Sequence, residues 1–358
     1  MLYYLIEDKY RDFPWCHNST RSLLEEAKKR RISIKEIRSY SEISKSDKNP
    51  TVFLLGGTTS WVENTISKAV EKNIYPITMA NRMLMPNGDN YSSVSLDIPM
   101  ATKLGVDYLY SLNRKHIALY GVNDSSTSDP IRENVFIKLT GKIEDVYHLG
   151  KSYSDMFSRL QNNLSKYDAI LCCNDFAAFS LLHSLKSIGV KVPDDIYIVG
   201  MGSANMTKLA QPSITTLSDD FQHFGTVAMN IYKTLQSDNF ISSMDIRLPA
   251  KLIVRESTAN RPYIPNTTSK INGVKESNPF FDDETVSDIL KLEKLLESCD
   301  ETDFKIIEFF MQNNTYSYIS EKCFIVETTV KYRIKKMKDI CGVNTRTELS
   351  EFLYKYLT

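Results

Sequence analysis

Residues 168–200 read DAILCCNDFAAFSLLHSLKSIGVKVPDDIYIVG, and this stretch decides the fold class. The apolar run at 169–173 has the length of a buried strand, residues 176–188 carry apolar side chains three and four apart, and 197–199 is a second apolar run. A strand, an amphipathic helix and a strand in this order form a crossover unit, which places both strands parallel in one sheet. The stretch therefore predicts an α/β fold.

The same alternation continues on both sides of this stretch. Further strands are expected at residues 2–6, 33–38, 51–55, 75–79, 116–120 and 145–149. Amphipathic helices are expected between them, at residues 22–31, 59–72, 100–112 and 155–165. Eight strands that alternate with helices suit two doubly wound lobes, so we predict a two-lobed α/β fold over most of the chain.

The composition excludes several classes of protein. The 358 residues include 44 lysines and arginines and 44 aspartates and glutamates, so the net charge is zero and a uniformly basic nucleic-acid binder is excluded. A hydrophobic content of 42% with 25% charged residues is typical of a globular chain. No apolar run approaches the ~18 residues of a membrane helix, and the amino end does not resemble a signal peptide. We therefore expect a cytoplasmic protein without membrane contact.

The sequence shows no motif for metal, cofactor or catalytic chemistry. Its six cysteines form no C-x-x-C pair, and its five histidines lack the spacing of metal ligands. The turn around Gly56 and Gly57 matches neither glycine pattern of a nucleotide-binding loop, and no Gly-x-Ser-x-Gly elbow occurs. We therefore expect no metal, no cofactor and no enzymatic activity.

Three ordered motifs resemble the sensor core of the lactose- and galactose-repressor (LacI/GalR) family. They are residues 191–200 (KVPDDIYIVG), 212–221 (PSITTLSDDF) and 248–258 (LPAKLIVREST). The resemblance covers about residues 1–258, and it implies a homodimer with a periplasmic-binding-protein-like fold that closes on a small-molecule effector, typically a sugar or another polar metabolite. It also implies that lobe one comprises residues 1–115 and 217–247, and lobe two residues 116–214 and 248–258.

The resemblance further implies which polar side chains bind the effector. Arg132 matches the family's effector-binding arginine, whose forked guanidinium holds two ligand oxygens; the alternative is a surface charge at a helix start. Asn174 and Asp97 match polar contacts of the ligand, and their alternatives are a turn residue and a helix cap. Gly202 stands where the family usually has an effector-binding acid, so the identity of the effector stays open.

Aromatic side chains complete the implied binding site. Phe221 and Tyr147 match apolar platforms on which a sugar ring stacks, and the alternative for both is packing in the core. Phe13 and Trp15 follow the first strand, in a region that lines the cleft in the family.

The composition changes after residue 258, and residues 259–301 are predicted to be a linker. Residues 260–278 are rich in Pro, Asn, Ser and Thr, and residues 276–303 carry ten acids against two lysines. Apolar residues at helical spacing predict a short amphipathic helix at 286–299, which packs on a lobe or pairs with a second copy.

The last segment, about residues 302–358, resembles a LuxR-type helix-turn-helix domain. Its most specific pieces are residues 327–331 (ETTVK) and 342–346 (GVNTR), while Val326 stands where the family has a capping serine. Residues 327–346 hold six bases against two acids, a local charge of +4. The candidate DNA-binding residues are Thr328, Thr329, Lys331, Arg333, Lys335, Lys336 and Lys338. The alternative is a solvated basic helix that has no partner.

These observations predict a cytoplasmic, ligand-responsive transcription regulator that binds double-stranded DNA through its carboxyl-terminal segment. RNA polymerase is a further partner that this interpretation allows. A solute-binding protein, or a sensor that acts through protein partners with its tail as the interaction module, is the alternative. An enzyme on a doubly wound fold is the third class, and the missing catalytic motifs disfavour it.

Overall fold

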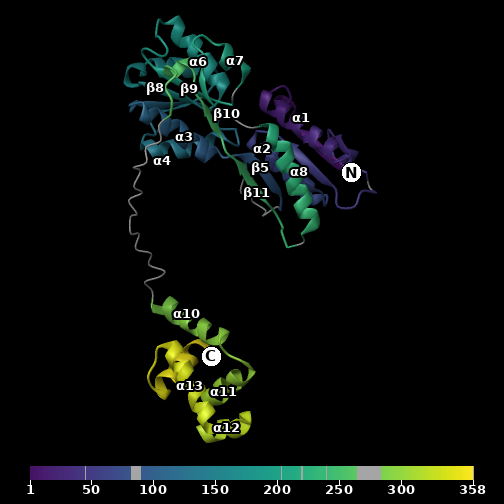
Figure 1. The fold of residues 1–358 in the computed structure, drawn as a ribbon, viewed down its shortest axis with the longest axis vertical. Coiled ribbons are helices and arrows are strands. Elements are labelled where there is room, and N and C mark those ends of the chain that lie inside the picture. Colours follow the sequence, from purple (N-terminus) through teal and green to yellow (C-terminus); the bar gives the residue numbers. More distant parts are fainter. Residues whose placement is uncertain are drawn as a thin grey trace. The chain divides into compact units, whose positions relative to one another are not determined.

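The structure is a computed structural model that describes residues 1–44, 46–81, 90–202, 204–218, 221–238, 240–263 and 284–357. The chain divides into two compact units, Met1–Thr268 and Ser269–Thr358 (Figure 1). The first unit contains two sheets with their covering helices, and the second is a group of helices. The predicted two-lobed α/β fold is therefore confirmed for the first unit.

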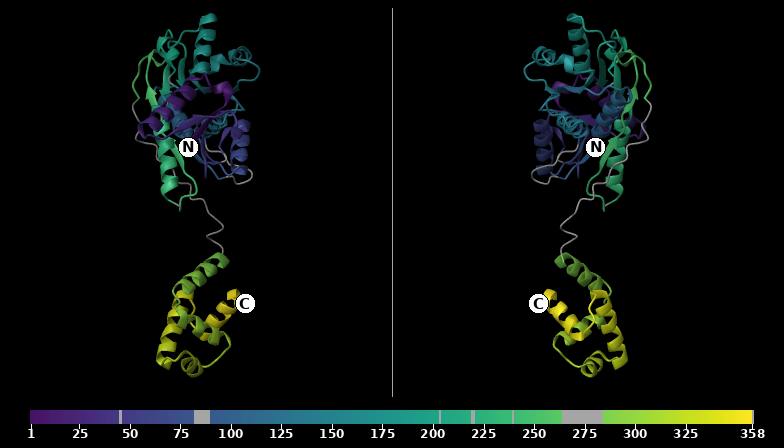
Figure 2. Two further views of the ribbon diagram at one scale, coloured as in Figure 1. Left: turned by 90° about the vertical axis from the view of Figure 1, so that its right-hand side faces the viewer. Right: turned by 90° about the vertical axis from the view of Figure 1, so that its left-hand side faces the viewer.

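The first lobe is built on a parallel sheet, for which the described residues supply six strands. Their order in the sheet is β11 (Asp245–Leu248), β5 (Ser92–Leu96), β4 (Tyr75–Thr78), β3 (Thr51–Leu55), β1 (Leu2–Ile6) and β2 (Ile34–Glu36). Alternate residues of β1 enter two different cores. One core lies under α2 (Thr59–Glu71) and the other under α1 (Pro14–Lys29) and α8 (Phe221–Ser237), so helices cover both faces (Figure 2). This double burial explains why β1 and β3 are apolar along most of their length.

Helices α1 and α8 lie side by side in this lobe (Figure 1). A Cβ atom on Gly225 would collide with the backbone of Ser22 and Leu23, so only glycine permits this approach of the two helices. The Ser22 hydroxyl donates to the Gln222 carbonyl at 2.5 Å and accepts the Gly225 N–H at 3.1 Å. These two hydrogen bonds join helices that are 200 residues apart in the sequence.

The second lobe has its own sheet, again with six strands in the described residues. The order is β12 (Lys251–Ile253), β10 (Thr215–Ser218), β9 (Tyr197–Met201), β8 (Ala169–Cys172), β6 (Ile117–Val122) and β7 (Val146–His148), and only β12 runs antiparallel to its neighbour. Helices α3 (Ile98–Ser111) and α4 (Asp129–Thr140) cover one face. Helices α5 (Tyr153–Gln161) and α6 (Asp175–Ser187) cover the other, and the short α7 (Asn205–Leu209) follows β9.

Strand β5 was not expected from the sequence because it reads SSVSL, with three hydroxyl side chains. The structure buries Ser92 and Ser93 completely. Ser92 accepts the Met244 N–H at 2.9 Å, and the Ser93 hydroxyl donates to the Asp245 carboxylate. These partners lie about 150 residues further along the chain, and the Tyr75 hydroxyl on β4 lies 2.8 Å from the Ser92 hydroxyl, so both neighbouring strands supply partners to the buried serines.

The second unit consists of α10 (Glu284–Glu297), α11 (Glu301–Met311), α12 (Tyr316–Cys323), α13 (Glu327–Cys341) and α14 (Arg346–Leu357). Its core combines Leu292 and Leu295 of α10 with Ile306, Phe310, Ile319, Val330, Ile334 and Leu353. The acidic helix predicted for the linker therefore packs inside this unit as α10. Residues 264–283, the centre of the predicted linker, lie outside the described part of the chain.

None of the helices in the described part of the chain is both long enough and apolar enough to cross a bilayer.

Candidate functional site

A pocket of about 290 Å³ lies between the two lobes of the first unit. Its walls come from the starts of α1, α6 and α8 and from the segment that joins β9 to α7. The lining residues are Pro14, Trp15, Asn18, Phe176, Gly202, Ala204, Asn205, Met206 and Phe221. Segments that follow the carboxyl ends of sheet strands form most of this wall, and this is where open α/β sheets ordinarily bind ligands.

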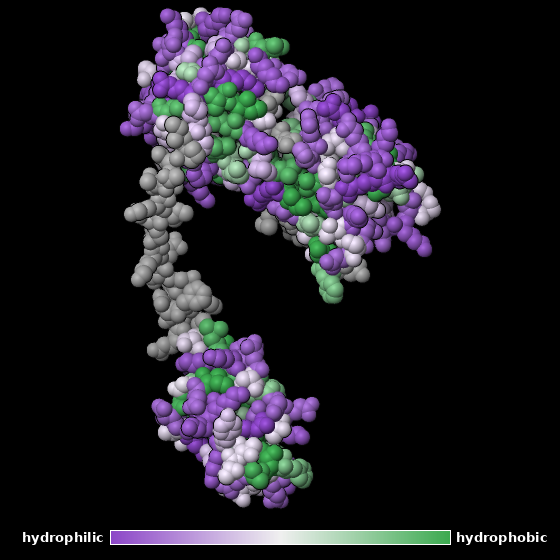
Figure 3. Space-filling view, in the orientation of Figure 1, coloured by the Kyte–Doolittle hydropathy of each residue, from purple (hydrophilic) through white to green (hydrophobic). Residues whose placement is uncertain are grey.

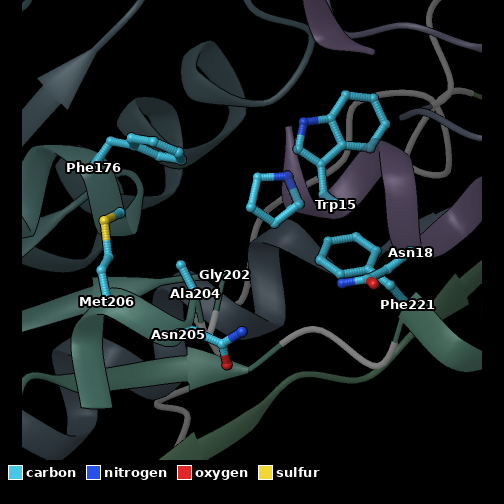
Figure 4. A pocket seen from close by; sticks show the side chains of 9 residues that line it. Trp15, Asn18, Phe176, Gly202, Ala204, Asn205, Met206 and Phe221 are labelled. Atoms are coloured by element: carbon cyan, nitrogen blue, oxygen red, sulfur yellow. The ribbon is translucent and has the colours of Figure 1, made fainter. Parts of the chain in front are cut away.

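Aromatic side chains face the pocket from both lobes (Figure 4). Trp15 and Phe221 approach from one side, and Phe176 and Met206 from the other. Next to the pocket, the rings of Phe13 and Phe176 meet across the gap between the lobes with centroids 5.4 Å apart. Tyr10 supports this arrangement by packing against both Phe13 and Trp15, at 5.3 and 5.5 Å between centroids. The pocket therefore offers apolar surfaces to opposite sides of a bound molecule.

Hydrogen bonds join the lobes directly on one side of the gap. The Thr59 N–H donates to the Ser125 carbonyl at 3.0 Å, and the Thr127 N–H donates to the Gly57 carbonyl at 2.9 Å. The buried Glu7 carboxylate holds the loop of lobe one in place, since it accepts the N–H groups of Gly57 and Thr58, each at 3.0 Å. The described conformation thus has the two lobes in contact.

Three of the predicted ligand-binding aromatic residues lie at this gap. Trp15 and Phe221 line the pocket, and Phe13 contacts the lining residue Phe176 next to it. Tyr147 lies elsewhere: it is buried in the core of lobe two, where its hydroxyl and that of Tyr167 are 3.0 Å apart. Its surroundings correspond to the core-packing alternative.

Arg132 is buried and already has partners within the protein. Its Nη1 donates to the Asp129 carboxylate at 2.5 Å, and its Nε donates to the Met201 sulfur at 3.0 Å. Burial raises the pKa of Asp129, while Arg132 and the Asn123 N–H oppose that rise by favouring the carboxylate. Arg132 is not among the residues that line the described pocket.

The two predicted polar contacts serve as helix caps. The Asn174 side chain accepts the Ala177 N–H at 2.9 Å at the start of α6, and the Asp97 carboxylate accepts the Met100 N–H at 3.0 Å at the start of α3. For Asp97 this matches the helix-cap alternative, whereas the alternative for Asn174 was a turn residue and its capping role was not predicted. Roles for Asn174, Asp97, Arg132 and Tyr147 in ligand binding stay predictions.

Asp175, which sequence reasoning did not select, organises the wall opposite Trp15. It is buried, and it accepts the Ala204 N–H at 2.6 Å and the Thr216 hydroxyl at 2.7 Å. Burial raises the pKa of this carboxyl, and those two hydrogen bonds lower it. Gly202 lines the pocket with φ of +121°, a conformation that only glycine adopts readily.

Sequence reasoning also missed six lining residues, which are Pro14, Asn18, Phe176, Ala204, Asn205 and Met206. Phe176 had a usable signal, because it follows the strand that ends at Cys172 and so begins a helix at the ligand-binding edge of the sheet. Asn205 and Met206 lie in a five-residue helix that shows no periodicity. Only the fold brings these residues to the gap.

The basic helix α13 in the second unit has a clear division of faces. Val330, Ile334 and Met337 are buried in the core of the unit, as the sequence predicted. Thr328 and Lys331 are exposed and Thr329 is half-buried, with the Lys331 ammonium 2.7 Å from the Glu327 carboxylate. Lys335 and Lys336 are exposed, whereas the Lys338 ammonium donates to the Asn344 carbonyl at 2.8 Å.

Arg333 differs from the other bases of α13, because it is held by two acids. Its Nη1 lies 2.8 Å from carboxylate oxygens of both Asp300 and Asp303, at the start of α11. The Arg333 guanidinium lowers the pKa of Asp300, and the two acids raise the pKa of Arg333. This geometry joins α13 to α11.

Comparison with known proteins connects the first unit to a family of domains. Residues 106–258 match the family model of the periplasmic binding protein-like domain. Catabolite control protein A of Staphylococcus epidermidis is 27% identical over 216 residues, which cover 58% of this chain and 64% of that protein. The HTH-type transcriptional regulator pepR1 of Lactobacillus delbrueckii is 26% identical over 54% of this chain and 60% of its own length. The chain thus spans less than two thirds of either relative.

Solved structures show the same fold. The LacI family transcriptional regulator CCPA from Weissella paramesenteroides, with bound sucrose, superposes with a TM-score of 0.57 at 21% identity, over 73% of this chain and 100% of that one. The transcriptional regulator CelR in complex with cellobiose gives a TM-score of 0.59 at 16% identity, over 72% of this chain and 84% of that one. The first unit therefore has the periplasmic-binding-protein-like fold that is found in LacI-family structures.

Proposed function

We propose that the protein is a ligand-responsive, DNA-binding transcription regulator. Residues 1–258 form the sensor, which binds a small polar metabolite between its lobes, and residues 302–358 form a LuxR-type helix-turn-helix domain. The observation that carries the proposal is the pair α12 and α13, in which the second helix buries one apolar face and presents basic side chains on the other. A second helix of this kind is the one that enters the major groove in helix-turn-helix proteins.

The basic side chains of α13 differ in how exposed they are and in whether they already have partners within the protein, and these differences indicate which of them can bind DNA. Lys335 and Lys336 are exposed, and Lys331 is exposed beside Glu327, so we assign these three to phosphates. Thr328 and Thr329 lie in the first turn of α13, where hydroxyl groups can reach phosphate oxygens near the positive end of the helix dipole. Arg333 holds Asp300 and Asp303, so we assign it to stability, and Lys338 in part to the turn at Asn344.

The ligand proposal rests on the pocket and on the relatives. Trp15, Phe176 and Phe221 offer stacking surfaces, and Asn18 and Asn205 offer amide donors and acceptors. The two solved relatives described above hold sucrose and cellobiose, so a sugar-like molecule is the first class of effector to test. We expect Arg132 to act chiefly through Asp129 and Met201 unless ligand binding releases it.

The proposal includes a homodimer, because two helix-turn-helix modules held together bind DNA bivalently. RNA polymerase stays a further predicted partner. The pepR1 and Weissella relatives are named transcriptional regulators, which favours a regulator over an enzyme or a solute-binding protein. Cytoplasmic location and the absence of a cofactor stay predictions.

The experiment is a salt-titrated mobility shift on the promoter region upstream of the protein's own gene. We expect the parent to lose affinity steeply with salt, and Lys335→Glu with Lys336→Glu to lose most binding while remaining folded. A matched control reverses Lys294 and Lys305, which are exposed on α10 and α11 and change the net charge equally. Equal retardation by the parent and the α13 variant would refute DNA binding by this helix.

A further inference from the structure

Two apolar side chains are exposed at the turn that joins α12 to α13, and a third is exposed further along α13. Phe324 is 95% exposed, Val326 is 65% exposed, and Tyr332 on α13 is 70% exposed. Figure 3 shows apolar side chains gathered at the end of the helical unit where Figure 1 labels α12. Ile325, between the first two, packs against the core, so the turn alternates between outward and inward apolar residues.

Local folding preferences do not explain Phe324 or Val326. Phe324 ends α12 with φ of +57°, a left-handed conformation that favours glycine or asparagine. Val326 occupies the N-cap of α13 and forms no side-chain capping hydrogen bond, although serine, threonine, aspartate or asparagine would form one. Each position therefore holds a residue that local structure disfavours and that solvent exposure also disfavours.

The rest of the same unit follows these preferences. Asp300 and Thr315 cap α11 and α12, accepting the N–H groups of Asp303 at 2.8 Å and Tyr318 at 3.3 Å. Gly342 and Asn313 occupy left-handed positions with φ of +72° and +61°. Among the described residues of this unit, the exceptions are thus confined to the turn before α13. Places where a sequence breaks local rules without a gain in packing are candidates for function.

The charges around this surface favour nucleic acid as the partner. Lys322, Lys331, Lys335 and Lys336 are exposed on α12 and α13, next to the acids Glu321 and Glu327. Tyr332 lies one turn after Thr328 and one turn before Lys335 and Lys336, so it shares their exposed side of the helix. A protein partner with an apolar patch would not need this lysine fringe, whereas DNA has phosphates on both sides of its groove.

We propose that Phe324, Val326 and Tyr332 form an apolar reading surface that contacts thymine methyl groups in the major groove. The proposal rests on the proposed function, because it needs α13 to lie in that groove. The lysines then supply affinity for any duplex, and the apolar surface supplies part of the sequence preference. The C5 methyl group of thymine is the apolar feature that the major groove offers to such side chains.

The test uses the full chain and a duplex recovered by selection from a random-sequence library. The duplex is made once with thymine and once with uracil, which lacks the methyl group. We expect the parent to bind the uracil duplex about tenfold more weakly, and Phe324→Gly to bind the thymine duplex about tenfold more weakly than the parent does. Replacing thymine by uracil should change the affinity of Phe324→Gly much less, because both changes remove the same contact.

The salt dependence of DNA affinity distinguishes the contribution of the apolar surface from that of the lysines. Phe324→Gly should keep the parent's slope of log affinity against log salt, whereas reversal of Lys335 and Lys336 should make that slope shallower. Phe304→Ala, at a phenylalanine that is 48% exposed on α11, is the control for loss of an exposed ring. Glycine is favoured at φ of +57°, so Phe324→Gly should fold, which circular dichroism checks.

Each other outcome has a definite meaning. A parent that binds thymine and uracil duplexes equally overturns the thymine contact. Parent-like DNA binding by Phe324→Gly, together with a smaller assembly in sedimentation, identifies the surface as a protein contact and also overturns it. If reversal of Lys335 and Lys336 leaves DNA binding intact, the proposed function fails instead.

Discussion

Replacing Arg132 by alanine tests what this buried guanidinium does in the sensor. The change leaves Asp129, whose side chain is 6% exposed, without its ion-pair partner. The carboxylate keeps one hydrogen bond from the Asn123 N–H at 3.1 Å, which does not replace a charge. We therefore expect Arg132→Ala to destabilise the first unit by forcing Asp129 to become protonated or to remain buried as an uncompensated anion.

The size of this effect follows from the cost of protonation. An aspartate in an unfolded chain has a pKa of about 3.9, so folding with a neutral Asp129 costs about 4 kcal/mol at about pH 7 and about 1.5 kcal/mol at about pH 5. Burial already raises the pKa of Asp129 in the parent, and loss of Arg132 raises it further. A carboxyl group whose pKa is raised by folding binds its proton more tightly in the folded chain than in the unfolded chain. The free energy of unfolding is therefore highest below the unfolded pKa and falls as the pH rises, so the variant should be least stable at neutral pH.

Tryptophan fluorescence during urea unfolding measures this difference. Both tryptophans of the chain, Trp15 and Trp61, lie in the first unit, so their signal reports on that unit in the full chain. Asp129→Asn with Arg132→Met is the control, because it removes both charges and should restore most of the stability at neutral pH. A loss of stability that is the same at both pH values would refute the assigned role. Ligand binding by the same variant, measured where it is folded, tests whether Arg132 also contacts the effector.

Two further variants test the packing of each unit. Arg333→Gln should destabilise the helical unit by about 1 kcal/mol, because it removes the contacts to Asp300 and Asp303. Well below the melting temperature its DNA affinity should equal that of the parent. Circular dichroism measures the stability and mobility shifts measure the DNA affinity, and a stable variant that has lost DNA binding would contradict the assignment. Gly225→Ala should destabilise the sensor by about 1–3 kcal/mol, because its Cβ would press on the backbone of α1. Urea unfolding measures this change, with Ala228→Gly on the same helix as a comparison, and an unchanged midpoint for Gly225→Ala would show that the helices can separate freely.

The alternation of apolar runs predicted much of the first unit. The strand, helix and strand of residues 168–200 appear as β8, α6 and β9, close to their expected bounds. Helix α1 begins at Pro14, earlier than the expected start at residue 22, because proline suits the first turn of a helix even where the apolar period is weak. Strand β5 escaped prediction because its serines are stabilised by β11, whose sequence position gives no hint of that pairing.

The candidate site was predicted in part. The predicted aromatic residues and the predicted polar residues differ in their outcome. The predicted aromatic residues Trp15 and Phe221 line the pocket, whereas Arg132, Asn174 and Asp97 have partners within the protein. Residue type says that a side chain can form hydrogen bonds, but it does not say which donor or acceptor lies nearest. A cap such as Asn174 and a ligand contact at the same strand end look alike in the sequence.

The sequence by itself determined the order of the elements and the division of faces on α13, because periodicity is a local property that each segment carries alone. The tertiary structure decided which polar groups pair and which aromatic residues meet. Trp15, Phe176 and Phe221 come from segments far apart in the chain, and they meet because α1, α6 and α8 begin at the same gap between the lobes. Such meetings depend on how the crossovers wind the two sheets and place their edges, which no local pattern encodes.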